Sequence, residues 1–167
     1  MRYWIDLVEN KKASFFHFSS TELSEGTIVG ARDNFSVHDD IEKLLEEARP
    51  PLMMPRNKVI YMMRSVDDMF YFGLTRKGFL YEIFPHGSVS KHDSSNIGSL
   101  QKARRSAERA QDGARVVTVP DWLDHEQCLR WASYYWDGVK NPDRAKPLWE
   151  FTASAGTIGK LIFTRTF

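Results

Sequence analysis

Short runs of apolar and aromatic residues, each closed by glycine, proline or polar residues, recur along the 167-residue chain. Runs of about four to eight such residues, bounded in this way, are typical of short β-strands. The pattern predicts strands over residues 2–8, 15–19, 27–30, 58–63, 79–84, 114–119, 149–153 and 160–167, with a flexible Ala155-Gly156 between the last two. Residues 86–98 are rich in serine and lack apolar periodicity, so they predict a loop of the length that often carries function.

Other segments carry helical signals. Ser36 stands three residues before Asp39, in capping-box spacing, and apolar residues then recur at helical intervals, which predicts a helix over 37–48. Further helices are predicted over 65–73, 99–110 and 124–139, the last with Cys128, Ala132, Tyr135 and Val139 on one face. Strands and helices do not alternate regularly, and no glycine-rich dinucleotide fingerprint occurs. The expected fold is therefore a single α+β domain, residues 1–167, with three or four helices.

Composition excludes several classes of function. The net charge is +1 with both signs spread along the chain, which argues against a dedicated, strongly basic nucleic-acid surface. A single cysteine, Cys128, excludes an intrachain disulfide and a multi-cysteine zinc site, and the histidines show no metal-ligand spacing, so no metal is expected. The N-terminus lacks a signal-peptide pattern and no apolar run is long enough to span a bilayer. We expect a cytoplasmic protein without membrane contact.

The strand over residues 15–19 carries the first candidate site. Strand alternation places His17 and Ser19 on one face and Phe16 and Phe18 on the other. A polar face on an aromatic strand is ordinarily that of an edge strand half exposed to water. The functional alternative is a histidine that hydrogen-bonds to a ribose, with a hydroxyl beside it.

Tyr61 and two carboxylates are the other candidates. Tyr61 lies in the apolar run Val59–Met63, where a tyrosine either packs in the core with its hydroxyl bonded or stacks on a flat heterocycle. Glu82 fits the solvent face of a strand and Asp93 fits turn chemistry. Either acid would become catalytic beside a developing positive charge or an attacking hydroxyl.

Four basic residues gather on the helix predicted over 99–110, namely Lys102, Arg104, Arg105 and Arg109. Such a patch is usually a solvated helix face. Its alternative is contact with a pyrophosphate or a nucleic-acid backbone.

The order of these segments, from about residue 14 to residue 125, resembles the ADP-ribosyltransferase superfamily in its His-Tyr-acid branch, and is most similar to the small rifamycin ADP-ribosyltransferases. Phe16-His17-Phe18-Ser19 is similar to the family strand that carries His, any residue, then Thr or Ser. Val59-Ile60-Tyr61 resembles the strand with the stacking tyrosine. Leu80–Pro85 resembles the strand that leads to the acidic loop, and Asp93 falls close to the catalytic aspartate. Shorter likenesses lie at Ile28-Val29-Gly30-Ala31-Arg32, Asn34-Phe35, 66–73 and 114–122.

This resemblance implies two small packed sheets with NAD+ in a cleft between them. His17 and Ser19 would hold a ribose, Tyr61 would stack on nicotinamide, and Arg32 would join the cofactor-binding residues. Asp93, or Glu82 because the acid is one residue out of register, would stabilise the charge that develops at the ribose carbon.

The implied activity is transfer of ADP-ribose from NAD+ to an unidentified acceptor, which is a protein, a nucleic acid or a small molecule. The segment between Phe35 and Tyr61 is longer than in the rifamycin enzymes, so rifamycin is not the expected acceptor. One alternative is another NAD+-using enzyme, an RNA 2′-phosphotransferase or a toxin that modifies nucleic acid. A different class is a non-catalytic RNA- or protein-binding module in which Phe15, Phe16 and Phe18 stack on bases.

Overall fold

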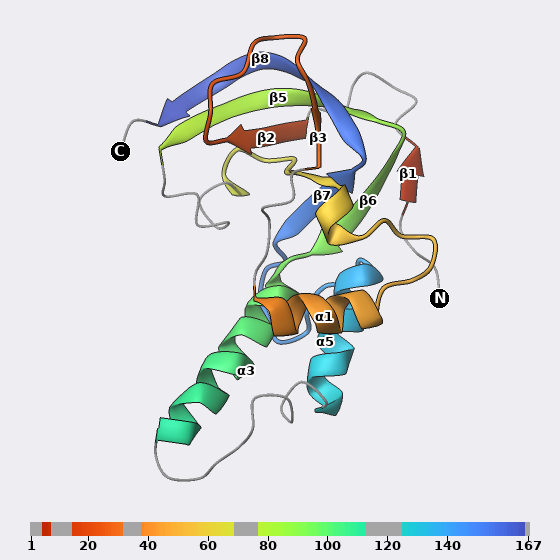
Figure 1. Ribbon diagram of the computed structural model, residues 1–167, viewed down its shortest axis with the longest axis vertical. Helices are drawn as coiled ribbons and strands as arrows, with labels where there is room; N and C mark the ends of the chain where they lie inside the picture. The colour runs from red at the N-terminus through yellow and green to blue at the C-terminus, as the bar shows by residue number, and fades with distance from the viewer. Residues whose placement is uncertain (1–4, 8–14, 32–37, 69–76, 113–124, 166–167) are drawn as a thin grey trace.

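The computed structural model describes residues 5–7, 15–31, 38–68, 77–112 and 125–165. Within these ranges the chain forms two four-stranded antiparallel sheets and three α-helices (Figure 1). Sheet A has the order β1-β6-β7-β4, with bounds Ile5–Leu7, Ser88–Asp93, Trp149–Ala153 and Ile60–Met62. Sheet B has the order β2-β5-β8-β3, with bounds Phe15–Ser19, Gly78–His86, Ala155–Arg165 and Ile28–Gly30. The helices are α1 (Asp39–Glu47), α3 (Ser95–Asp112) and α5 (Glu126–Trp136). The coarse prediction of an α+β fold with small sheets and three helices is thus confirmed.

Two long chain segments run through both sheets. Strand β5 passes into β6 at Gly87, and β7 passes into β8 at Ser154. The pairing is continuous across this boundary, since Ser90 lies opposite Thr152 in sheet A and His86 lies opposite Ala155 in sheet B. Gly87 has a φ of +71°, a conformation that glycine adopts without steric cost. Residues 78–93 and 149–165 therefore form one bent antiparallel pair, the two-strand ribbon, which both sheets share.

The first hydrophobic core lies between the sheets. Sheet B contributes Phe15, Tyr81, Ile83 and Ile158, and sheet A contributes Ile60, Met62, Val89, Phe151 and Ala153. Phe15 and Phe151 meet edge to face, with ring centroids 5.3 Å apart. Aligned packing of two apolar sheet faces is the expected way to bury both.

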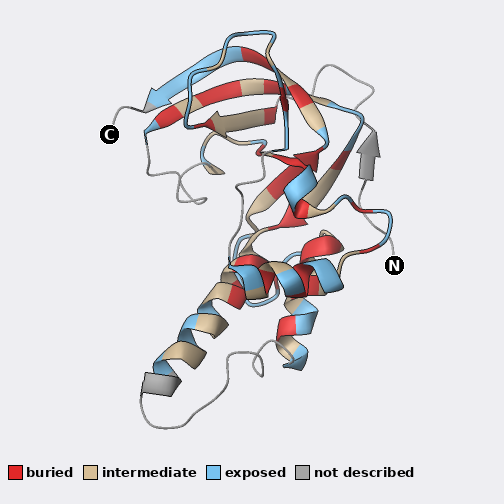
Figure 2. Ribbon diagram, viewed as in Figure 1, coloured by how far each residue is buried: buried red, intermediate tan, exposed pale blue. Residues whose placement is uncertain are grey.

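The second core lies among the three helices. It contains Ile41, Leu44 and Leu45 of α1, Ile97 and Leu100 of α3, and Cys128, Ala132, Tyr135 and Trp136 of α5. The Trp136 indole donates to the Leu45 carbonyl over 2.6 Å, which ties α5 to α1. Burial is concentrated in the sheets and in the helix turns nearest to them, while the far part of α3 is half buried or exposed (Figure 2).

The loop predicted over residues 86–98 is wrong, because strand β6 and the first turn of α3 occupy it. The serines conceal the strand, whose backbone pairs with β1 and β7 whatever its side chains are. Only Val89 supplies a strongly apolar side chain to the core there, and the other buried positions are the polar His92 and Asp93.

Smaller corrections concern the ends of elements. Helix α1 begins at Asp39 with His38 as its N-cap, two residues later than expected from Ser36. Ala155-Gly156 is not a flexible link but the start of β8, where a Cβ on Gly156 would lie 2.8 Å from Cδ1 of Ile83. Helix α5 ends at Trp136, and Val139 beyond it is exposed.

The remaining predicted elements fall into two groups. Within the described residues, the strands at 2–8, 15–19, 27–30, 58–63, 79–84, 149–153 and 160–167 and the helix at 99–110 are confirmed, most of them with shifted ends. The strand at 114–119, most of the helix at 65–73, and the residues Arg32 and Ser36 lie outside the described residues. In the part of the chain that is described, no helix combines the length and the apolar character needed to cross a bilayer.

Candidate active site

A pocket of about 910 Å³ opens where sheet A meets the helices. Its walls come from the segment after β4, the first turns of α3 and the loop before β7. Arg56 and Glu150 line it from the protein interior, and each is only 4% exposed. The rim carries both signs of charge, with Asp67 and Asp68 on one segment and Arg144 and Lys146 on another. The pKa of the Asp68 carboxyl is raised by partial burial and by the neighbouring Asp67.

Arg56 connects three elements at the pocket. It begins the 3₁₀ turn Arg56–Lys58 just before β4. Its Nε donates to Glu42 of α1 over 3.2 Å, and its Nη1 donates to Glu150 of β7 over 3.2 Å and to the Tyr135 hydroxyl of α5. Burial alone would lower the pKa of this guanidinium, but the negative potential of Tyr135 and Glu150 outweighs burial and raises it above its ordinary value. Arg56 is therefore a fixed positive charge.

Glu150 is held by hydrogen bonds on both carboxylate oxygens. Oε1 accepts from the Tyr135 hydroxyl over 2.5 Å as well as from Arg56, and Oε2 accepts from the Ser94 hydroxyl over 2.6 Å. Ser94 and Glu150 also line the pocket. A carboxylate whose position is set in advance by such donors can stabilise positive charge without reorganising at the moment of reaction.

The buried His92 contacts Tyr135 through its ring and through a hydrogen bond. The His92 ring stacks on the Tyr135 ring, with centroids 4.6 Å apart. Its Nδ1 donates to the Tyr135 carbonyl over 3.1 Å, so the unprotonated Nε2 accepts from the Thr152 hydroxyl over 3.2 Å. Burial lowers the pKa of His92 to about 4, and the ring is neutral at physiological pH.

The structure brings His17 and Tyr61 together. His17 Nδ1 donates to the Tyr61 carbonyl over 2.9 Å, where a backbone bridge between Phe16 and Met63 joins β2 to the end of β4. The Tyr61 hydroxyl donates to the Arg56 carbonyl over 2.7 Å, and the Arg56 guanidinium lies 5.2 Å from the centre of the Tyr61 ring. Burial raises the pKa of the Tyr61 phenol above its ordinary value. Of these three residues, Arg56 lines the pocket, whereas Tyr61 and His17 do not.

Ser19 and Glu82 lie elsewhere. Ser19 is buried, and its Oγ accepts from the Thr21 backbone N–H over 3.2 Å, which is local turn chemistry. Glu82 lies on β5 opposite Phe16 and is half buried. Neither residue lines the pocket. Arg32 lies outside the described residues, so its predicted role has no structural counterpart here.

Asp93 is enclosed by the backbone. It has no exposed surface, its Oδ1 accepts from the N–H groups of Ser95 and Leu148 over 3.0 and 2.9 Å, and its Oδ2 accepts from Asn141 over 2.8 Å. These bonds cap α3 and hold the loop before β7. With both oxygens engaged by the backbone, Asp93 has the surroundings of a structural carboxylate, and of the acids Asp93, Glu82 and Glu150 it is Glu150 that lines the pocket.

The basic residues of α3 do not act as one patch. Arg104 turns toward α1, where its Nε bonds to Asp40 over 2.9 Å, and it also pairs with Glu108. Lys102, Arg105 and Arg109 are exposed.

Sequence reasoning missed Arg56, Ser94, Glu150 and Arg144. Glu150 did leave a signal, because an acid between Trp149 and Phe151 in a predicted strand occupies a position where a charge is costly unless it is paired. Arg56 left none, since it lies in an irregular link after Pro55.

Comparison of the chain with protein-family models, with curated proteins and with solved structures gave no match. The functional conclusion therefore rests on the residues of the pocket and on their chemistry. Within the described residues, no group of three or more histidine, cysteine or acidic side chains is placed to hold a metal ion.

Proposed function

We propose that the chain is an NAD+-dependent ADP-ribosyltransferase whose reaction takes place in the pocket between Arg56, Glu150 and the start of α3. The observation that carries the proposal is Glu150, a carboxylate fixed by Tyr135 and Ser94 in the interior of a pocket of about 910 Å³. A volume of this size falls within the range of about 300–1,000 Å³ that is typical of small-molecule sites.

The proposed reaction breaks the bond between nicotinamide and the ribose C1′. Nicotinamide leaves with the bonding electron pair as a neutral molecule, and C1′ takes on oxocarbenium character. Glu150 stabilises this positive charge electrostatically, and an acceptor nucleophile then bonds to C1′ and releases its proton. Catalysis of this kind depends on placement and on charge arranged in advance, and it needs no metal in the step itself.

The surroundings of Glu150 suit this role. Arg56 divides its positive charge between two carboxylates, because it pairs with Glu42 as well as with Glu150. Lys146 at the rim supplies a positive charge for the pyrophosphate of NAD+. His17 and Tyr61 then act as positioning residues, since they fix the backbone of Arg56 through the Tyr61 hydroxyl.

The first prediction concerns Glu150→Gln, which keeps the size of the side chain and removes the charge. We expect nicotinamide release from NAD+, measured by chromatography, to fall roughly a hundredfold, the scale of losing one electrostatic contact to a transition state. NAD+ should still raise the melting temperature, because ligand binding to the folded state stabilises it. Circular dichroism would confirm that the variant is folded.

The matched control is Glu126→Gln on α5, where the acid is exposed and pairs only with Arg130 among the contacts described. Nicotinamide release should stay at the wild-type level in this variant. Wild-type protein that neither releases nicotinamide nor gains thermal stability with NAD+ would refute the proposal and favour a binding module. Transfer of the 2′-phosphate of an RNA to the ADP-ribose of NAD+, with release of nicotinamide, the dephosphorylated RNA and a cyclic phosphate of ADP-ribose, would instead identify the RNA 2′-phosphotransferase.

A further inference from the structure

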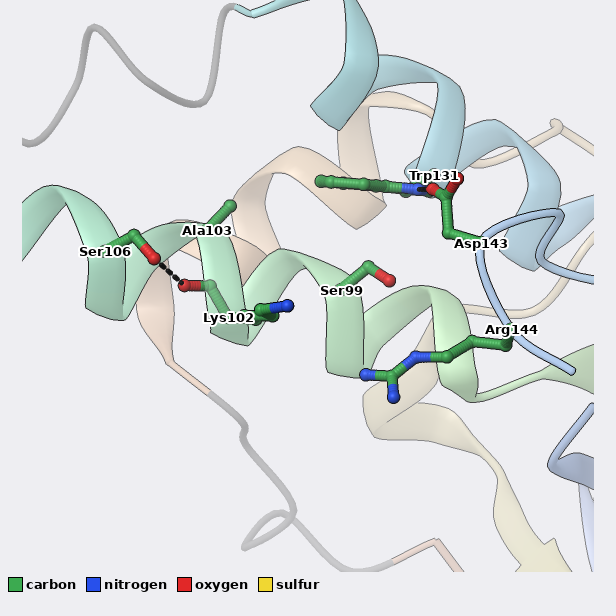
Figure 3. Close-up of a pocket in the computed structure, with 7 residues that line it drawn as sticks. All are labelled: Ser99, Lys102, Ala103, Ser106, Trp131, Asp143 and Arg144. Carbon is green, nitrogen blue, oxygen red and sulfur yellow. Dashed lines mark hydrogen bonds between the residues drawn. The ribbon is translucent and has the colours of Figure 1, made fainter.

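A second pocket, of about 370 Å³, opens on the outer side of the helices (Figure 3). Ser99 and Lys102 of α3 line one wall, Trp131 of α5 lines another, and Asp143 and Arg144 of the loop before β7 close it. It is separate from the Glu150 pocket, but Arg144 lines both.

The indole of Trp131 provides a flat surface whose position is fixed. Its Nε1 donates to Asp143 Oδ2 over 2.9 Å, and one part of the ring packs against the helix core while the rest stays accessible. Figure 3 shows the ring edge-on above α3, with the Ala103 side chain directed toward it. An aromatic ring held in this way loses little conformational entropy when a second ring stacks on it.

Two cationic side chains complete the pocket. Lys102 and Arg144 are exposed, and neither forms an ion pair with any described residue. Arg104 on α3 and Arg130 on α5, by contrast, are each paired with a carboxylate. In Figure 3 the ammonium and the guanidinium both reach toward the stretch of α3 around Ser99. Their charges are thus available to an anion from solution.

We propose that this pocket binds one nucleotide unit of a single-stranded nucleic acid. The base stacks against Trp131, and the adjoining phosphates contact Lys102 and Arg144. A stacking aromatic beside unpaired cations is the recurring arrangement with which proteins hold single strands without reading their sequence. The carboxylate of Asp143, at the edge of the indole, accepts from a ring N–H or an amino group of a base.

The shared Arg144 links the two pockets. A strand whose phosphate contacts Arg144 in the outer pocket continues directly to the Glu150 pocket. On the proposed function, this makes a nucleic acid the acceptor of ADP-ribose. The acceptor role rests on that proposal, whereas the binding of the strand does not.

The test measures binding in the absence of NAD+. Labelled oligothymidylate and oligouridylate of about twelve nucleotides, a length within known single-strand site sizes, are titrated with full-length protein and followed by fluorescence anisotropy. Lys102→Glu/Arg144→Glu should weaken binding at least tenfold. The logarithm of the affinity should also fall less steeply with the logarithm of the salt concentration. The negative slope should become shallower by about 1.4, the value for two phosphate contacts on a single strand. The two oligonucleotides show whether the sugar matters.

The matched control is Arg105→Glu/Arg109→Glu, which reverses two exposed charges on α3 that line neither pocket. We expect less than a threefold loss of affinity. Trp131→Leu should weaken binding roughly tenfold and Trp131→Phe much less, because stacking contributes on that scale and needs only a ring. Circular dichroism checks that each variant is folded.

The inference would be overturned by no binding of the wild type at low salt, by equal losses in the two charge-reversal variants, or by wild-type affinity in a folded Trp131→Leu. Capture of an acidic peptide with the same affinity as the oligonucleotides would do so as well. Nicotinamide release by a protein that binds no oligonucleotide would leave the transferase in place and remove its nucleic-acid acceptor. The reverse result would leave a nucleic-acid-binding protein that does not use NAD+.

Discussion

Two buried carboxylates on adjacent strands show how their donors set the role of a residue. Asp93 of β6 lies opposite Trp149, and Glu150 of β7 lies opposite His92, one register position away. Asp93 is surrounded by backbone N–H groups that belong to a helix cap and a loop. Glu150 is held by side chains of Ser94, Tyr135 and Arg56 and lines a pocket. The first arrangement fixes the chain, and the second leaves a charge where a ligand can reach it.

His92 gives a pH-dependent prediction. Its pKa is lowered by burial from 6.5 to about 4, so the unfolded chain takes up a proton before the folded one does. The neutral form of His92 therefore contributes fully to the stability of the folded protein above about pH 6.5, and this contribution is lost as the pH falls toward 4. We expect the free energy of unfolding to fall by up to about 3 kcal/mol over this window because of His92. Urea denaturation at a series of pH values measures it.

The comparison variant is His92→Phe, which keeps the stacking on Tyr135 and removes the titrating group. It should be less stable at neutral pH, because the Thr152 hydroxyl and the Tyr135 carbonyl lose their partner. Its stability should change less than that of the wild type between pH 6.5 and 4. Parallel pH curves for the two proteins would contradict the assignment of this dependence to His92.

Sequence patterns pointed to His17 and Tyr61, but they did not locate the pocket lined by Arg56 and Glu150. Alternation correctly placed His17 and Ser19 on one face of β2, because the period of a strand is fixed. The residues around Arg56 are contributed by α1, α5, β4 and β7, and no local pattern records which distant elements meet. Asp93 drew attention because of its loop-like neighbours, although those neighbours form a strand.

At the scale of elements, close approach of the backbone decides how the edge of sheet B is built. Gly78 begins β5, and a Cβ there would lie 2.7 Å from the Ser19 backbone carbonyl and would also collide with the Phe18 ring. The close approach of β2 to the first residue of β5 therefore requires that residue 78 has no side chain. Strand β6 is held by backbone pairing with β1 and β7. Its serine-rich sequence did not predict it, because this pairing does not depend on apolar side chains.

We expect Gly78→Ala to lower the free energy of unfolding by roughly 1–3 kcal/mol, the scale of overpacking at a tight contact. The control is Gly30→Ala on β3, where nothing lies within 4 Å of the added Cβ. That change should be neutral or slightly stabilising, since alanine loses less backbone entropy than glycine. Chemical denaturation measures both variants. A loss in Gly30→Ala as large as that in Gly78→Ala would show that glycine entropy, and not the contact, dominates.

On the scale of the whole molecule, Arg56 joins the helices to sheet A. It bonds to α1 through Glu42, to α5 through Tyr135 and to β7 through Glu150, while the Tyr61 hydroxyl of β4 bonds to its carbonyl. Few single side chains reach so many elements, and this one is almost fully buried. Its loss therefore acts on the helices and the sheets at once.

Arg56→Met removes the charge and keeps most of the side-chain length. It leaves Glu150 buried without its cation, so we expect a loss of about 3–5 kcal/mol in the free energy of unfolding. Arg130→Met, which breaks an exposed pair with Glu126 on α5, should cost less than about 0.5 kcal/mol. Denaturation followed separately by circular dichroism and by tryptophan fluorescence would show whether both cores fail together. Similar stabilities for the two variants would contradict the central place of Arg56.

The two-strand ribbon has a consequence for any attempt to dissect the protein. Each of the segments 78–93 and 149–165 contributes one strand to sheet A and another to sheet B. No single cut of the chain therefore gives two fragments that each contain one complete sheet. A fragment that ends at residue 87 has β5 without its neighbour β8, and the complementary fragment has β8 without β5. We therefore expect neither fragment to fold on its own. Two such fragments should regain the fold only when they are mixed, each completing the other's sheets.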